Sequence, residues 1–193
     1  MQTSMRLLED VRDFTNGDAW TRFHAIYAPY LFGWLRRHAV PAHDVDDLLQ
    51  EVLRVVAVEL PNFTHNSRPG AFRCWLRTIL ANRIRDYQRN RKSQGMLGSE
   101  ALDRLADHLA DERSALSATW DREHDRYVAR RMLAAIEADF EPVTWKAFWL
   151  VAIEGHEPEW VAGRLEISVE SVYASKSRVL KRLRLAAADF LDR

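Results

Sequence analysis

Apolar side chains recur every three or four positions in several long segments of this chain, and this spacing is the strongest constraint on its fold. In residues 18–38 it places the apolar side chains on one face of a helix, and it returns at residues 45–60 and 72–87. Only 7 Gly and 6 Pro are scattered among 193 residues, which leaves little turn chemistry for a many-stranded sheet. The sequence therefore predicts an all-α fold, with 47% hydrophobic residues available to form cores.

Helical patterning continues in the last third of the chain. It predicts a helix over residues 127–140, another over 142–155, and two helices joined by a short turn over 157–184. In that pair Pro158 suits a first helical position, and Ser168 is typical of an N-cap.

Residues 93–125 have weaker periodicity and begin with the turn-rich run SQGMLGSE. We expect them to form an acidic linker with a short helix near residues 100–112. The linker would divide the chain into two small helical domains, residues 1–92 and residues 126–193.

Charge is unevenly distributed, although 28 basic and 28 acidic residues give a formal net charge of zero. Residues 68–92 have eight cations and one acid, a net charge of +7, and residues 171–184 have five cations and no acid. Residues 41–51 have four acids and no Lys or Arg, and residues 99–125 have eight acids and three arginines, a net charge of −5. Each block is typical of a solvated surface and, equally, of a surface that binds a charged partner.

Several classes of protein are excluded by the composition. The single cysteine, Cys74, rules out a disulfide framework or a site of several thiolates, and the default setting is the reducing cytoplasm. No apolar run approaches the roughly twenty residues of a membrane span. The seven histidines lack metal-binding spacing, and no phosphate loop or nucleophile motif occurs, so we expect no metal, no cofactor and no enzymatic centre. Neighbouring cations could make Cys74 a redox sensor, but a passive thiol is the favoured interpretation.

The last predicted helix has two distinct faces. Val172 and Val179 belong to its apolar stripe, and the opposite face has short or hydrogen-bonding side chains near the N-terminus and cations further along. This arrangement suits insertion into a DNA major groove, as in a helix-turn-helix, although an αα-hairpin with solvated arginines fits too. Glu166 stands at the turn, where Gly would be favoured, and Lys176 falls on the apolar stripe.

The two charged helices of the N-terminal half suggest different partners. The acidic helix suits docking on a basic protein, and simple solubility explains it equally well. The basic helix has Trp75 and Asn82 among its cations and follows a polar loop over residues 62–70, a combination suited to single-stranded DNA with an unstacked base. Trp75 lies on the apolar stripe, so a core position is its favoured interpretation.

Three segments, in this order and spacing, resemble one known family. They are DLLQEVLRVV at residues 47–56, FRCWLRTILANRIRDYQR at 72–89 and VAGRLEISVESVYASKSRVLKRLR at 161–184. Together they are similar to regions two and four of bacterial sigma factors of the extracytoplasmic-function (ECF) group of the sigma-70 family, over about residues 18–187. The resemblance implies a region 2 helical bundle that binds core RNA polymerase and opens the minus-ten promoter element, and a region 4 helix-turn-helix that reads the minus-35 element.

The resemblance also implies roles for individual positions. The core polymerase-binding positions are Asp47, Leu48, Gln50 and Glu51. The minus-ten DNA-binding positions are Asn62, Phe63, Thr64, His65, Asn66 and Arg68 in the loop, and Arg77, Asn82 and Arg85 on the basic helix. The minus-35 DNA-binding positions are Ser171, Tyr173, Ala174, Ser177, Arg178 and Lys181. The departures from the family pattern are Glu166, Lys176 and Tyr173.

The function implied by the resemblance is an alternative sigma factor in the cytoplasm, with core RNA polymerase and promoter DNA as partners and catalysis left to the polymerase. An anti-sigma factor is a further candidate partner, and no membrane insertion is expected. A conventional helix-turn-helix regulator would instead bind duplex DNA alone as a symmetric dimer. A helical adaptor that binds only protein is a third class, and it does not need the basic helix.

Overall fold

The computed structural model describes residues 11, 17–38, 40–64, 70–95 and 98–190. Its regular elements within these ranges are all helices. The all-α prediction is therefore confirmed for the described chain.

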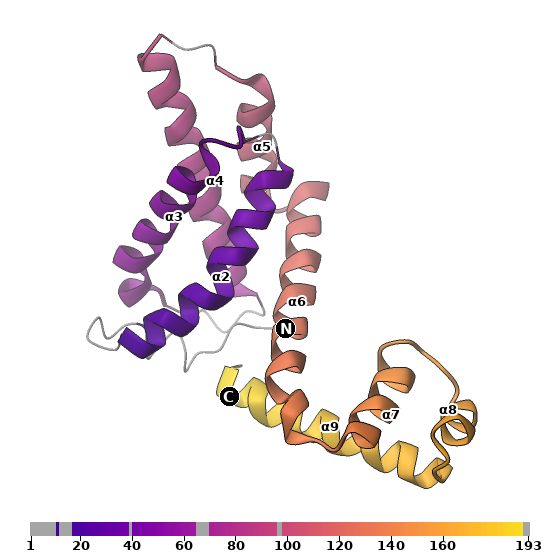
Figure 1. Cartoon of the computed structure of the whole chain (residues 1–193). Helices are drawn as coiled ribbons and strands as arrows, with labels where there is room; N and C mark the ends of the chain where they lie inside the picture. The colour runs from indigo at the N-terminus through magenta and orange to yellow at the C-terminus, as the bar shows by residue number, and fades with distance from the viewer. Residues whose placement is uncertain (1–10, 12–16, 39, 65–69, 96–97, 191–193) are drawn as a thin grey trace.

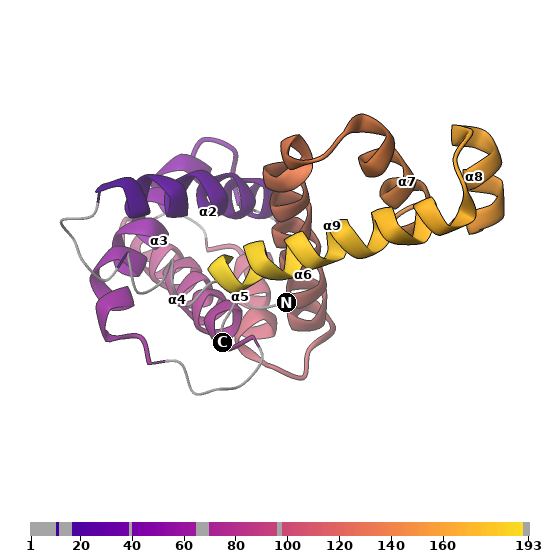
Figure 2. The ribbon, with the colours of Figure 1, turned by 90° about the horizontal axis from the view of Figure 1, so that it is seen from below.

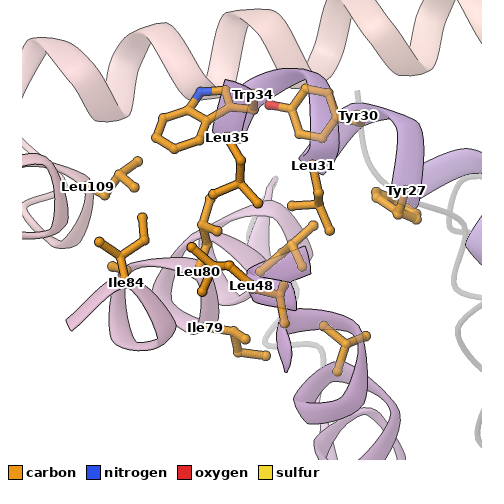
Figure 3. Packing of buried hydrophobic residues seen from close by; sticks show 14 of the residues in the cluster. Tyr27, Tyr30, Leu31, Trp34, Leu35, Leu48, Ile79, Leu80, Ile84 and Leu109 are labelled. Carbon is orange, nitrogen blue, oxygen red and sulfur yellow. The ribbon is translucent and has the colours of Figure 1, made fainter. Parts of the chain in front are cut away.

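The N-terminal half is a bundle of helices (Figure 1). Its first elements are α2 (Gly17–Arg37), α3 (Val45–Glu59), the short 3-10 helix η1 (Leu60–Asn62) and α4 (Ala71–Ser93). Their apolar stripes meet in one core, and Figure 3 shows side chains of α2, α3 and α4 converging there. Pro29 lies inside α2, so residues 17–37 form one helix and not two.

The start of α3 is held by contacts with α4 and not by a side-chain cap. Asp44 is the N-cap residue, but its side chain makes no capping hydrogen bond. It accepts hydrogen bonds from the Tyr87 hydroxyl and from the Arg91 guanidinium of α4, the latter at 3.1 Å. Asp44 thus fastens the start of α3 to α4 through charge-assisted contacts.

The segment expected to be a linker is part of the N-terminal core. The expected short helix is confirmed as α5 (Glu100–Ala110), and α6 (Ala115–Ile136) begins well before residue 127. Serines cap both helices, with Ser99 accepting from the Leu102 amide and Ser114 from the Ser117 amide. The buried side chains that this segment adds to the core are Leu102, Leu105, Ala106, Leu109 and Trp120.

The apolar spacing of α5 and the aromatic contacts of Trp120 explain the packing of this segment. The four apolar residues of α5 follow a three- and four-residue spacing and face α4, which lies beside α5 (Figure 1). The Trp120 ring lies 5.2 Å from that of Trp34 and 5.0 Å from that of Tyr30, between centroids. The assignment of a region 2 domain to residues 1–92 and of a region 4 domain to residues 126–193 stays a prediction.

Helix α6 belongs to both halves of the molecule. Its first half packs in the N-terminal core, where the Trp120 carbonyl accepts a hydrogen bond from the Tyr30 hydroxyl of α2 at 3.3 Å. Its other hydrogen bonds to α2 include those from the Tyr127 hydroxyl to the Ile26 carbonyl at 2.8 Å and from Arg131 to the Ala25 carbonyl at 3.1 Å. Its last turns place Leu133 and Ile136 in a second core. Figure 1 shows α6 running from the bundle to the C-terminal helices.

The C-terminal half contains a small group of helices that follow α6. They are the 3-10 helix η2 (Glu137–Asp139), α7 (Pro142–Ala152), α8 (Pro158–Leu165) and α9 (Val169–Phe190). Pro142 and Pro158 stand at the starts of their helices, as expected. Figure 2 shows α9 extending from α8 past α7 to α6, and it packs on all three. No described helix is long and apolar enough to cross a membrane.

Candidate nucleic-acid interface

The acidic face of α3 presents Asp47, Gln50 and Glu51 to solvent. Glu51 pairs with Arg54 one turn further along, at 2.6 Å, and such exposed pairs are weak enough to be exchanged for a partner. Leu48, predicted together with these residues, is only 3% exposed and packs in the N-terminal core. Its side chain holds α3 in place and is not available to a partner protein in this structure.

An open pocket of about 360 Å³ lies where η1 meets α4. Its lining residues are Glu59, Asn62, Phe63, Thr64 and Trp75. Aromatic faces beside amide and hydroxyl groups can stack on a nucleic-acid base and hydrogen-bond its edge. The pocket therefore has the chemistry expected for an unstacked base.

The predicted loop residues are placed differently by the structure. Asn62 and Thr64 are exposed at the pocket, whereas Phe63 is 8% exposed and packs on the Phe72 and Trp75 rings. His65, Asn66 and Arg68 lie outside the described residues.

Trp75 combines two roles that the sequence pattern presents as alternatives. It is half-buried and packs against the N-terminal core, which confirms the core interpretation. It also lines the pocket, as does Glu59, which the sequence did not indicate. The signal for Trp75 was its place on the apolar stripe next to a polar loop; for Glu59 the sequence contains no comparable signal.

Each described cation of α4 between residues 73 and 92 has a carboxylate partner. Arg83 and Arg89 pair with Asp86 of the same helix, and Arg91 pairs with Asp44. The other four cations pair with acids of α5 and α6: Arg73 with Asp121 and Asp125, Arg77 with Asp121, Arg85 with Asp107, and Lys92 with Asp103. The negative charge of residues 99–125 signals such partners in the sequence, but the pairing depends on the packing of α5 and α6 against α4.

The three α4 residues predicted to contact the minus-ten DNA do not share one environment. Arg77 is 3% exposed, and its guanidinium lies 3.3 Å from the Asp121 carboxylate between α4 and α6. It is therefore enclosed by protein and is not presented to DNA in this structure. Asn82 is exposed and accepts a hydrogen bond from half-exposed Arg85 at 3.2 Å, so these two do lie together on the surface.

A second pocket, of about 590 Å³, lies between α4 and α5. Its lining consists of the Asn82 amide and charged groups of both signs: Arg83, Arg85, Asp86, Arg89, Lys92, Asp103 and Asp107. Arg85 and Lys92 pair with carboxylates of α5 across this groove, whereas Arg83 and Arg89 pair with Asp86 of their own helix. A groove with this lining suits an anionic chain such as a nucleic-acid backbone only where its cations are released from these carboxylates.

The groove-reading face predicted for α9 is exposed throughout. The exposed side chains are Ser171, Tyr173, Ala174, Ser177, Arg178 and Lys181. Val172 and Val179 are fully buried on the opposite side, so the helix is anchored by one face and presents the other. Within the described residues, no ion pair joins Arg178 or Lys181 to a carboxylate.

The turn between α8 and α9 has the backbone geometry of a tight helix-helix connection. Glu166 has φ 55° and ψ 43°, the left-handed conformation in which Gly is normally favoured. Ser168 then caps α9, because its hydroxyl accepts the Ser171 amide at 3.2 Å, which confirms the predicted N-cap. Lys176 is half-buried beside the apolar stripe, as expected of a side chain that extends its amine to solvent.

Cys74 does not have the environment of a reactive thiol. Its pKa is raised above the usual value, chiefly by burial and also by the Asp121 and Glu112 charges, although the Arg77 and Arg73 charges act in the opposite direction. The thiol therefore stays protonated near neutral pH, in agreement with the passive interpretation. In the ranges that the structure describes, no group of three or more His, Cys, Asp or Glu side chains is arranged to hold a metal ion.

Residues 23–94 match the family model of sigma-70 region 2. The match begins in α2, spans α3 and the pocket at η1, and ends just after α4, so it includes the acidic face and the basic helix. No curated protein matches the chain. Residues 23–94 are thus similar to sigma-70 region 2, and this similarity supports a sigma-factor role in RNA polymerase-directed transcription.

Proposed function

We propose that this chain is an alternative sigma factor of the ECF group, which joins core RNA polymerase and directs it to a specific set of promoters. The acidic face of α3 docks on the polymerase. The pocket at η1, with the exposed part of α4, holds the minus-ten element, and α9 reads the minus-35 element. The chain itself catalyses no reaction, because the polymerase supplies the chemistry.

One observation supports the promoter-specific part of this proposal above the others. The same chain combines a region 2 domain with a downstream helix pair whose second helix is anchored by Val172 and Val179 and leaves its opposite face open. The side chains of Tyr173 and Arg178 on that face offer hydrogen-bond donors and acceptors that can contact base edges in a major groove. A helical adaptor that binds only protein has no need of such a face.

Transcription with purified core polymerase on a library of genomic fragments tests the proposal. Core polymerase with the chain should produce transcripts from a small set of start sites that core alone does not use. If the chain binds duplex DNA alone as a symmetric dimer and adds no start site, it is a conventional regulator and the proposal fails. If it binds core but changes no start site, it is an adaptor.

A charge-reversal variant tests the docking face in the same assay. Asp47→Lys with Glu51→Lys should abolish co-purification with core while leaving helicity unchanged, because both side chains are exposed. The matched control is Glu137→Lys with Glu141→Lys, two exposed acids near the start of α7, which should co-purify like the wild type. Equal behaviour of the two variants would remove α3 as the docking face.

A further inference from the structure

The basic surface of α4 is already neutralised by the chain's own acids. All seven described cations from Arg73 to Lys92 pair with carboxylates, and four of them pair with acids of α5 and α6. We call Asp103, Asp107, Asp121 and Asp125 the covering acids. They place negative charge on the helix that the proposed function assigns to DNA.

The covering acids form two groups with different accessibility. Asp121 pairs with the enclosed Arg77 and with Arg73, so these contacts fasten α6 to α4. Asp107 and Asp103 are more open: the side chain of Asp107 is 72% exposed in its 2.9 Å pair with Arg85, and Asp103 lies 2.9 Å from Lys92 at the surface. Exposed pairs contribute little to stability, so this second group can exchange partners without unfolding the bundle.

The exchangeable pairs occupy the groove where a phosphate chain would lie. Arg85, Lys92, Asp103 and Asp107 all line the 590 Å³ pocket between α4 and α5. A guanidinium and an ammonium donate to carboxylate and phosphate oxygens through the same N–H groups, so the two anions compete for these donors. A nucleic-acid strand entering this groove therefore competes with Asp103 and Asp107 for Arg85 and Lys92.

In the part of the chain that the structure describes, the cations of helix α9 are not covered in this way. Among the described residues, only Arg182 of the α9 cations pairs with an acid, Asp139, at 2.7 Å. Arg178 and Lys181 on the groove-reading face have no carboxylate partner there. Within the described residues, the cations on the groove-reading face of α9 are thus free of carboxylate partners, whereas the cations of α4, the helix proposed to bind a single strand, are paired.

We propose that Asp103 and Asp107 of α5 are built-in competitors of single-stranded nucleic acid for the cations of α4. In the free chain they weaken binding of a single strand. The strand makes its full contacts with Arg85 and Lys92 only when Asp107 and Asp103 of α5 release these cations. This inference rests on the proposed function for the identity of the natural ligand, a promoter strand. The competition itself is a property of the free chain.

Binding of fluorescein-labelled oligo(dT) to the full-length free chain, followed by anisotropy over a series of salt concentrations, tests the competition. Asp103→Asn with Asp107→Asn should bind the oligonucleotide about three- to tenfold more tightly than the wild type at low salt. Two released cations should also steepen the slope of log K against log salt by about 1.4, at roughly 0.7 per phosphate contact on a single strand. A purely structural role of the two acids would not change this slope.

A matched variant separates competition from overall charge. Glu137→Gln with Glu141→Gln also removes two negative charges, at positions far along the chain from α4, and this variant should bind the oligonucleotide like the wild type. Equal tightening in both variants, or no change in either affinity or slope, overturns the proposal. If the double Asn variant loses helicity, Asp107→Asn alone carries the test, with a slope change of about 0.7.

The outcome is independent of the transcription assay. If the chain directs no transcription but the double Asn variant has the steeper salt dependence, the competition is supported and the proposed function fails. If the chain directs transcription but the double Asn variant has the same salt dependence as the wild type, the proposed function is supported and the competition fails. Absence of oligonucleotide binding by wild type and variant alike overturns the competition.

Discussion

The arginines of α4 have the same chemistry but different surroundings. Arg77 is enclosed between α4 and α6, whereas Arg85 lies at the edge of the groove with Asn82. A guanidinium that is enclosed needs a charged partner, because leaving it unpaired in a protein interior is costly. Arg77 therefore acts first on the stability of the fold.

Replacing Arg77 by Met tests this difference. Met keeps the aliphatic part of the side chain and removes the charge-assisted contact with Asp121, so the free energy of unfolding should fall by about 1–3 kcal/mol in urea titrations. The control Arg85→Met, at an exposed pair, should change it by less than about 1 kcal/mol. If Arg77→Met leaves stability unchanged but impairs promoter opening, and a pre-melted template restores transcription, then Arg77 contacts DNA after all.

Glu166 gives a second prediction at the scale of one residue. Its left-handed backbone is strained for a residue with a Cβ, so Glu166→Gly should raise the free energy of unfolding by about 1 kcal/mol. Arg164→Gly, two positions earlier inside α8, should instead lower it by about 0.5–1 kcal/mol. Thermal melts of the two variants beside the wild type measure both effects, and a lower melting temperature for Glu166→Gly would contradict the strain argument.

At the scale of elements, most of the helices were predictable, because their apolar stripes appear directly in the sequence. The first turns of α6 were not, because they fall in the weakly periodic segment before residue 127. The N-cap at Ser168 and the helix starts at Pro142 and Pro158 were equally readable. The side-chain partners of the polar residues could not be predicted from the sequence. Asp44 has the sequence of a capping residue, yet Tyr87 and Arg91 compete for its carboxylate once α3 and α4 are packed.

The exposed face of α9 leads to a prediction about sequence preference. Tyr173→Ala with Arg178→Ala should relax the preferred sequence at one or two base pairs of the upstream element, at a cost of about 1–3 kcal/mol for each lost base contact. Lys181→Ala, which removes a cation further along the helix, should weaken all upstream sequences alike. Selection of randomised upstream sequences by the polymerase complex measures both. Recovery of the same motif by the wild type and the double variant would show that these two residues do not specify sequence.

At the scale of the whole molecule, the largest difference from expectation concerns residues 93–125. Their acidic composition and weak periodicity predict a linker, because the apolar stripe of a short helix looks the same whether the helix is free or docked. Docking depends on a complementary surface, here the face of α4 with Ile84 and the face of α2 with Trp34. Figure 3 places Leu109 of α5 in this same cluster with Ile84 and Trp34, and the buried Trp120 extends the N-terminal core into α6.

Trp120 is the residue whose substitution best separates a linker from a core segment. It has 0% exposure and packs between Trp34 and Tyr30 of α2, so Trp120→Ala should lower the free energy of unfolding by about 3–5 kcal/mol. Trp160→Ala, at a 49% exposed tryptophan of α8, should cost about 1 kcal/mol or less and serves as the matched control. Urea denaturation followed by far-ultraviolet circular dichroism measures both variants. If Trp120→Ala costs no more than Trp160→Ala, α6 does not complete the N-terminal core, and residues 93–125 act as the linker that their composition predicts.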